Sequence, residues 1–368
     1  IMADKVNHTE AVEIIEAMGP TDWVRLIGPV GCGKSSILNT LAKRNPEHVP
    51  IHLDVPTMDF PDFYMPSVDK EKEESMLFLN RRFGKSDPRP KIYLYDEWDK
   101  AMESVKKMTL QQLLHLDFNG WTPPKGTMRF STGNLNSEGV GDTIQAHAMN
   151  RNIEIEIGKP TVSELKDYAL DNNWAPEIIV LLQEVPECLD DYRDMDDAQI
   201  TTEEERMKHN PYIHDPRVHK GQFVSPRSLE RGSRIISSKL GGNTESMFKA
   251  CSGNWGSAMT EKFRTILQTS NQLPRWQDIM DDPNTAKLPE SGIAETILVT
   301  KAQHQVKSND AMGKWMTYLN RIESVETQSM FATLMYRMGG EKQKLAMHNQ
   351  MFTKWARDNR WVFAADKR

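Results

Sequence analysis

The sequence predicts an α/β fold with a parallel sheet in its first half and a helical second half. Five short apolar runs of strand type alternate with helical patterns between residues 1 and 159. A glycine-rich loop joins the first run to a helix, and from residue 160 onward the patterns are helical. Strands separated by helices favour a parallel sheet covered on both faces, because parallel neighbours need crossover connections.

The strands and the first helices follow from local patterns. Helices are expected over residues 10–18, before Gly19 and Pro20, and over residues 35–43, after the glycine-rich loop. The last strand alternates with period two and the others are short buried runs. The five expected strands are residues 23–27, 51–53, 92–95, 128–131 and 153–157.

Length and composition limit the organisation and the class of protein. A chain of 368 residues predicts several subdomains: a nucleotide-binding α/β part at 1–159, a helical lid at 160–288 and a helical C-terminal region at 289–368. The net charge of −6 argues against a broad basic surface for duplex nucleic acid. Three distant cysteines, no membrane-length apolar run and no secretory leader pattern predict a cytoplasmic protein without disulfides.

An acidic segment lies inside the lid at residues 184–206. Ten carboxylates stand there against two arginines, Arg193 and Arg206. A solvated loop or exposed helix face is the first interpretation, and a docking surface for a basic partner is the second.

The glycine-rich loop has the phosphate-binding pattern G-x-x-x-x-G-K-[ST], with an apolar strand before it and a helix after it. Backbone N–H groups of such a loop surround phosphates, and the helix that follows adds its positive dipole end. Lys34 would reach the β- and γ-phosphates, and the Ser35 hydroxyl would bind magnesium. The predicted nucleotide-binding residues are Gly28, Pro29, Val30, Gly31, Cys32, Gly33, Lys34, Ser35, Ser36 and Asp96.

Two carboxylates, Asp96 and Glu97, end the strand at residues 92–95. Ligands bind at the carboxyl ends of the strands in open parallel sheets. Asp96 is therefore the second predicted magnesium-binding residue, and Glu97 is predicted to polarise the water that attacks the γ-phosphate. The chain lacks the N-K-x-D motif of a GTPase, and the Asp-Glu pair favours hydrolysis over small-molecule phosphorylation.

Three further polar residues are candidates for the hydrolytic site. Asn134 follows the strand at residues 128–131, where it could orient the attacking water or only form a turn. Arg151 precedes the fifth strand, and Arg227 follows Ser225-Pro226 at the start of a lid helix. An arginine at the γ-phosphate can accelerate hydrolysis by about 10³–10⁵-fold.

The order of these motifs resembles that of the AAA+ ATPases, and within them the MoxR-like family, including a subgroup common in phages and bacteria. Further similarity covers residues 58–69, residues 111–133, the lid and, most weakly, the helical tail. The resemblance implies that Asn134 is the sensor-1 residue, Arg151 the finger that reaches a neighbouring subunit and Arg227 the sensor-2 residue. Family members often carry Arg-Phe at the finger position, whereas Asn152 follows Arg151 here.

The same resemblance implies ATP and Mg²⁺ as ligands and a ring of identical subunits, a hexamer. It also implies chaperone-like remodelling of a protein client, often with a von Willebrand factor A-domain partner. Two other functions stay open: a nucleic-acid motor or loader, which the negative charge disfavours, and a scaffold that binds ATP with little turnover.

Two secondary features are interpreted as well. Residues 118–126 are expected to form a β-hairpin, from which Trp121 or Lys125 could grip a client, although Trp121 could instead cover the core. Histidines recur every five residues, but without cysteines or matched acidic residues they are interpreted as loop residues rather than metal ligands. They are His209, His214 and His219.

Overall fold

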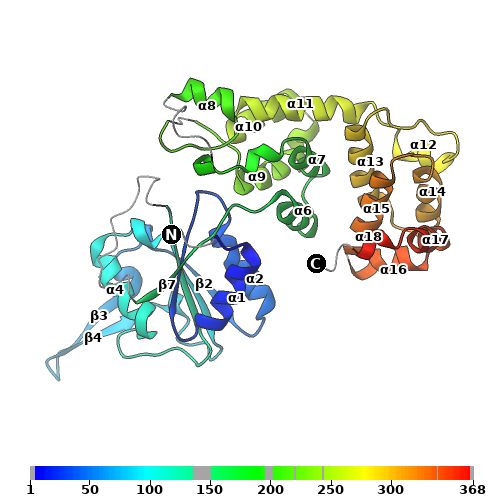
Figure 1. Ribbon diagram of the computed structural model, residues 1–368. Coiled ribbons are helices and arrows are strands. Elements are labelled where there is room, and N and C mark those ends of the chain that lie inside the picture. Colours follow the sequence, from blue (N-terminus) through cyan, green and yellow to red (C-terminus); the bar gives the residue numbers. More distant parts are fainter. Residues whose placement is uncertain are drawn as a thin grey trace.

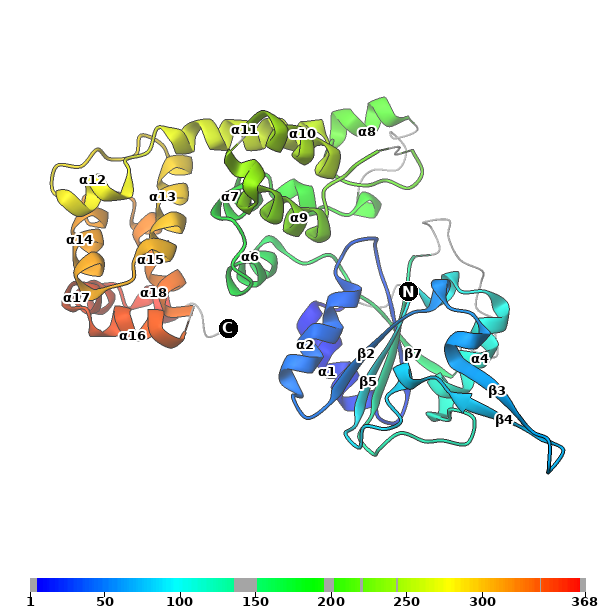
Figure 2. The ribbon, with the colours of Figure 1, turned by 180° about the vertical axis from the view of Figure 1, so that it is seen from behind.

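The computed structural model describes residues 5–135, 151–194, 202–218, 221–242, 244–337 and 339–364. Figure 1 shows an α/β part, coloured blue to cyan, and a helical part, coloured green to red. The view from behind shows the same separation (Figure 2). None of the helices in the described ranges is long and apolar enough to cross a membrane.

A parallel sheet of five strands forms the centre of the α/β part. Its order is β2-β5-β6-β1-β7, and every neighbouring pair is parallel. This is the strand order typical of the AAA+ P-loop fold, so the predicted fold class is confirmed. The strands are β1 (Trp23–Ile27), β2 (Val49–Asp54), β5 (Lys91–Asp96), β6 (Met128–Gly133) and β7 (Asn152–Glu156).

Helices cover both faces of this sheet. Helices α1 (His8–Met18) and α2 (Ile37–Arg44) pack on one face, and α4 (Glu103–His115) covers the other. Because side chains alternate along a strand, β5 sends Ile92 and Leu94 into the first layer and Tyr93 and Tyr95 into the second. Both layers therefore consist mainly of apolar and aromatic side chains, and the carboxylate of Asp96 stands at the carboxyl end of β5.

The helical part has one continuous buried cluster that runs from Leu165 to Trp355. The predicted boundary at residue 288 falls between helices that share this cluster, and it stays a prediction. The helices of the predicted lid are α6 (Val162–Asp171), α7 (Pro176–Glu184), α8 (Glu203–His209), α9 (Pro226–Ser237), α10 (Thr244–Trp255), α11 (Ser257–Asn271) and α12 (Trp276–Asp281). The later helices are α13 (Gly292–Gln305), α14 (Asn309–Leu319), α15 (Val325–Arg337), α16 (Gly340–His348), α17 (Gln350–Asp358) and α18 (Trp361–Ala364).

The hairpin of the α/β part does not lie where the sequence predicted it. Strands β3 (Tyr64–Asp69) and β4 (Glu74–Leu79) follow the one-turn helix α3 (Phe60–Phe63) and project from the domain (Figure 2). Residues 118–126 form no strand, so the expectation of a hairpin there is wrong. They begin with a tight turn in which the backbones of Phe118 and Trp121 exchange hydrogen bonds, and the two rings lie 5.4 Å apart. Trp121 thus packs on the core.

Candidate functional site

The predicted phosphate loop leaves the carboxyl end of β1. Gly31 and Gly33 have φ angles of 75° and 97°, a region that side chains with a Cβ rarely adopt. At Gly28 a Cβ would lie 2.6 Å from the carbonyl oxygen of Ile157, so only glycine lets the loop pass β7 so closely. The chain enters α2 through a 3₁₀ turn (Lys34–Ser36), in which the Ser36 hydroxyl donates to the Gly33 carbonyl at 2.6 Å.

The Lys34 ammonium connects this loop to the end of β6. It donates to the carbonyl oxygens of Gly28 at 2.6 Å and Pro29 at 2.9 Å, and to Asn134 Oδ1 at 3.2 Å. The side chain is largely buried. The structure therefore brings Lys34 of the loop together with Asn134, which the sequence analysis placed after a different strand.

Asp96 joins the loop to the end of β5. The Ser35 hydroxyl donates to its two carboxylate oxygens at 2.8 and 3.0 Å, His52 lies at 2.9 Å and the Thr132 hydroxyl at 2.5 Å. Burial raises the pKa of Asp96, but these hydrogen bonds outweigh it and hold the pKa below its ordinary value. The group is therefore a carboxylate at neutral pH. His52 and Thr132 were not predicted, although the parallel pairing of their strands with β5 could have indicated both.

The oxygen ligands that Ser35 and Asp96 offer suit a magnesium ion. Ser35 and Asp96 provide a hydroxyl and a carboxylate within hydrogen-bonding distance of each other, which are ligands that Mg²⁺ accepts while it keeps several waters. Within the described ranges no cluster of three or more histidine, cysteine, aspartate or glutamate side chains could hold a metal, and this includes His209 and His214. His219 lies outside the described residues.

Glu97 begins the turn after β5 in an unusual backbone conformation. Its φ and ψ are 52° and 36°, in the left-handed region, and its N–H donates to Thr132 Oγ1 at 2.9 Å. The side chain is about half exposed, and its Oε1 accepts from Lys100 Nζ at 2.8 Å. Backbone strain of this kind concentrates at functional sites, where the surrounding structure compensates for it.

The two candidate arginines lie in different places. Arg227 is exposed at the start of α9, where Ser225 abuts the phosphate loop so closely that a Cβ on Gly31 would lie 2.9 Å from its hydroxyl. Arg151 is exposed just before β7, hence at the amino end of the strands, whereas the loop and Asp96 lie at the carboxyl end. The structure brings Arg227 near the loop and does not bring Arg151 to the site of its own chain.

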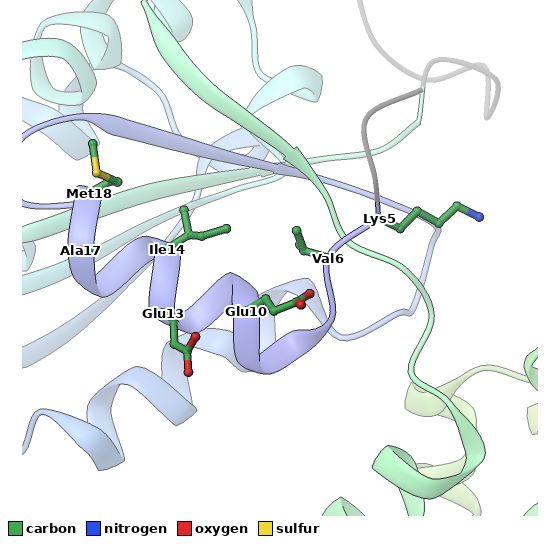
Figure 3. A pocket seen from close by; sticks show the side chains of 7 residues that line it. All are labelled: Lys5, Val6, Glu10, Glu13, Ile14, Ala17 and Met18. Atoms are coloured by element: carbon green, nitrogen blue, oxygen red, sulfur yellow. The ribbon is translucent and has the colours of Figure 1, made fainter. Parts of the chain in front are cut away.

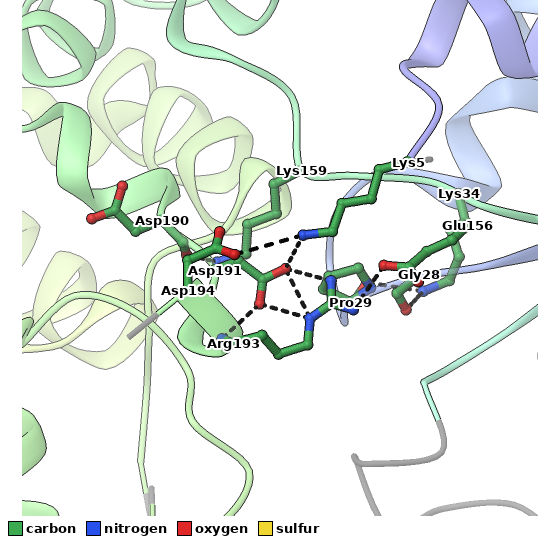
Figure 4. A network of polar contacts seen from close by, with 10 residues as sticks. All are labelled: Lys5, Gly28, Pro29, Lys34, Glu156, Lys159, Asp190, Asp191, Arg193 and Asp194. Atoms are coloured by element: carbon green, nitrogen blue, oxygen red, sulfur yellow. Dashed lines mark hydrogen bonds and ion pairs between the residues drawn. The ribbon is translucent and has the colours of Figure 1, made fainter. Parts of the chain in front are cut away.

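An ionic network joins the lid to the α/β part beside the loop (Figure 4). Asp191 lies between Lys5 at 3.4 Å and Arg193 at 2.5 Å, and Arg193 also contacts Glu156 at 2.7 Å. Burial raises the pKa of Asp191, but hydrogen bonds from Arg193 outweigh it and lower the pKa to about 2. Asp191 is thus buried and paired, so the interpretation of the acidic segment as solvated is wrong for this residue, although it fits Glu204 on α8.

An open surface hollow lies away from the phosphate loop. It has a volume of about 520 Å³ and lies along α1, between Lys5 and Met18 (Figure 3). No residue of the phosphate loop lines it. The chemistry of the chain is therefore concentrated at the strand ends and not in this hollow.

Comparison with protein-family models and with curated proteins finds no match. Solved structures with a similar fold include the Thermotoga maritima RuvB Holliday junction branch migration motor, at 15% identity over 72% of this chain and 74% of that chain, with a TM-score of 0.33. A putative ATPase from Cytophaga hutchinsonii has 12% identity over 89% of this chain and 79% of that chain, with a TM-score of 0.30. The fold assignment rests on the strand order of the chain itself.

Proposed function

We propose that the chain is a magnesium-dependent ATPase of the AAA+ class. One observation carries the proposal: two hydrogen-bonded links, Ser35 to Asp96 and Lys34 to Asn134, join the glycine-rich loop to the ends of β5 and β6. A loop that turns its backbone N–H groups inward and lies against a carboxylate and an amide suits a nucleoside triphosphate with its metal.

Each residue has a separate task in this proposal. The loop amides and Lys34 bind the phosphates, and Ser35 and Asp96 hold the magnesium ion, which neutralises charge on the phosphate oxygens when bound. Glu97 accepts the proton of the attacking water, and Asn134 orients that water. The Glu97 carboxylate must then leave Lys100, its partner in this structure.

Two substitutions test the hydrolytic function. Glu97→Gln should abolish ATP turnover while ATP binding stays within about threefold of wild type, and Lys34→Ala should weaken ATP binding itself. The control is Glu71→Gln, an exposed carboxylate in the turn between β3 and β4, which should behave as wild type. If the wild-type chain binds ATP without turnover, alone or with a partner, it is a scaffold and the hydrolytic function is refuted.

We further propose a MoxR-like ring, a hexamer, that remodels a protein client or acts with a von Willebrand factor A-domain protein. The location of Arg151, away from the site of its own chain, supports a role at the nucleotide of a neighbouring subunit, and Arg227 would contact the γ-phosphate from the lid. Arg151→Ala should then lower turnover in the oligomer while each subunit still binds ATP. Client capture by Glu97→Gln with ATP tests remodelling, and strong salt-sensitive stimulation of turnover by DNA would favour a nucleic-acid motor.

A further inference from the structure

The hydroxyl of Thr132 bonds two consecutive residues of the candidate site. Thr132 lies on β6 and is 1% exposed. Its Oγ1 donates to Asp96 Oδ1 at 2.5 Å and accepts the N–H of Glu97 at 2.9 Å. A hydroxyl has one proton to donate and two lone pairs. Here the proton goes to the carboxylate proposed to hold magnesium, and a lone pair goes to the backbone of the residue proposed to activate water.

The backbone of Glu97 depends on such support. A left-handed conformation is unfavourable for a residue with a Cβ, and the partly buried N–H of Glu97 needs a hydrogen-bond partner. Thr132 provides that partner. The direction in which the Glu97 carboxylate leaves the strand end is set by this turn, so a relaxed turn would move the carboxylate.

Thr132 is itself held firmly. β6 lies between β5 and β1, and Thr132 pairs with Leu26 in the register of the two strands. Its branched Cβ restricts rotation about χ1. On the far side of Gly133, Asp99 accepts a hydrogen bond from Arg25 at 2.7 Å, and this buried pair ties the turn after Glu97 to β1. The Thr132 hydroxyl therefore has a fixed position relative to the end of β5.

We propose that Thr132 is a positioning residue, whose hydroxyl sets the relative placement of Asp96 and Glu97 and thereby both magnesium binding and water activation. This inference rests on the proposed ATPase function of the same site. Thr132 contacts neither water nor phosphate in the proposed mechanism. It acts through two neighbours at once, which distinguishes it from His52, a half-exposed partner of Asp96 alone.

The test compares two substitutions at this residue. Thr132→Val keeps the shape of the side chain and removes the hydroxyl, whereas Thr132→Ser keeps the hydroxyl and removes a methyl group. Partners of metal ligands typically change metal affinity or activity by about 10–100-fold when they are lost. We expect Thr132→Val to lower kcat and raise the half-saturating Mg²⁺ concentration by about 10-fold or more, with ATP affinity in the absence of metal unchanged. Thr132→Ser should stay within about threefold of wild type.

A second readout separates this inference from the proposed function. Binding of Mn²⁺ to the ADP complex, followed by electron paramagnetic resonance, should weaken about 10-fold in Thr132→Val and not in Thr132→Ser. If the wild type does not turn over ATP, the hydrolytic function fails, and Mn²⁺ binding still decides the role of Thr132. The inference is overturned if Thr132→Val matches wild type in Mn²⁺ binding, or if Thr132→Ser is impaired as strongly as Thr132→Val, because the methyl group would then be what matters.

Discussion

The close packing around Gly133 allows a specific prediction for Gly133→Ala, because other side-chain atoms already occupy the place of a Cβ. An added Cβ would lie 1.9 Å from Asp99 Oδ2 and 3.2 Å from Arg25 Nη2, whereas real Cβ contacts essentially never fall below 3.0 Å. Gly133→Ala therefore needs a displacement of 3.0 − 1.9 = 1.1 Å at the carboxylate. That carboxylate accepts from Arg25 Nη2 at 2.7 Å, and both side chains are 7% exposed.

The cost follows from what the displacement breaks. Loss of one partner from a buried ion pair costs about 3–5 kcal/mol, because a charge is left without compensation. Here the charge of Asp99 would lose its partner, while Arg25 would still contact Glu154, so the cost should lie at the lower end of that range. We therefore expect Gly133→Ala to lower the free energy of unfolding of the α/β part by about 3 kcal/mol or more, and to abolish turnover because Asn134 is the next residue.

The assay is urea unfolding followed by circular dichroism, with hydrogen exchange to locate the effect at β6. The control is Gly253→Ala, on the exposed side of α10, where nothing lies within 4 Å of an added Cβ. Alanine is the better helix former, so this variant should gain about 0.5–1 kcal/mol. A Gly133→Ala variant within about 0.5 kcal/mol of wild type, with β6 amides equally protected, would refute the reasoning.

Four further outcomes are expected. Asp191→Asn weakens the contact with Lys5 across the junction and loosens Arg193, which contacts Glu156 there, so opening between lid and α/β part should become easier by about 1 kcal/mol, measured by hydrogen exchange at both sides of the junction. In the wild type the stability that Asp191 adds to the folded chain should fade as the pH falls from about 4 towards 2, because its pKa in the folded chain is about 2 against an ordinary 3.8. Arg227→Ala should lower turnover without lowering the unfolding temperature, since the side chain is exposed; a loss of stability would contradict a role at the nucleotide. Burial raises the pKa of Cys188 to about 12, so a thiol reagent at pH 8 should modify it only after unfolding, and rapid labelling of the folded chain would contradict the packing.

The sheet could be predicted from the sequence mainly because β1, β5 and β6 are buried on both faces. Such strands appear as short apolar runs with polar residues at their ends, and the run at residues 92–95 before Asp96 shows the pattern clearly. The strand order is not contained in any single run. It follows from the order of the motifs, which is why the resemblance of the motif order to AAA+ proteins predicted more of the architecture than periodicity did.

The two hairpin regions show where local patterns are insufficient. At Asn119 and Gly120 both φ angles are positive, as in a two-residue hairpin turn, but Pro123 and Pro124 follow and cannot donate to a ladder, so no strands extend from the turn. Residues 64–79 form the actual hairpin, although Pro66 interrupts the first strand. Most of its apolar side chains beyond Tyr64 are exposed, so burial does not impose the alternation by which a strand is recognised.

The contacts around Asp96 could be predicted only in part. Ser35 and Asp96 belong to known patterns, and their proximity follows from the shared edge of the sheet. His52 and Thr132 reach Asp96 because β2 and β6 flank β5, and that adjacency is a property of the sheet rather than of any segment. The same holds for Asp99 and Arg25, which lie far apart in the chain and meet beneath Gly133.

The separation of the buried clusters bears on how the lid can move. Among the described residues, one apolar cluster lies wholly in the helical part and two lie wholly in the α/β part. Ion pairs connect the helical part to the α/β part, formed by Asp191 with Lys5 and by Arg193 with Glu156. An apolar interface between the two parts would have to repack its side chains each time it closed, whereas charged groups can pair in a range of geometries. The joint should therefore loosen as ionic strength rises, mainly at the partly exposed Lys5, because the buried pair of Asp191 and Arg193 is screened much less; both cores stay intact throughout.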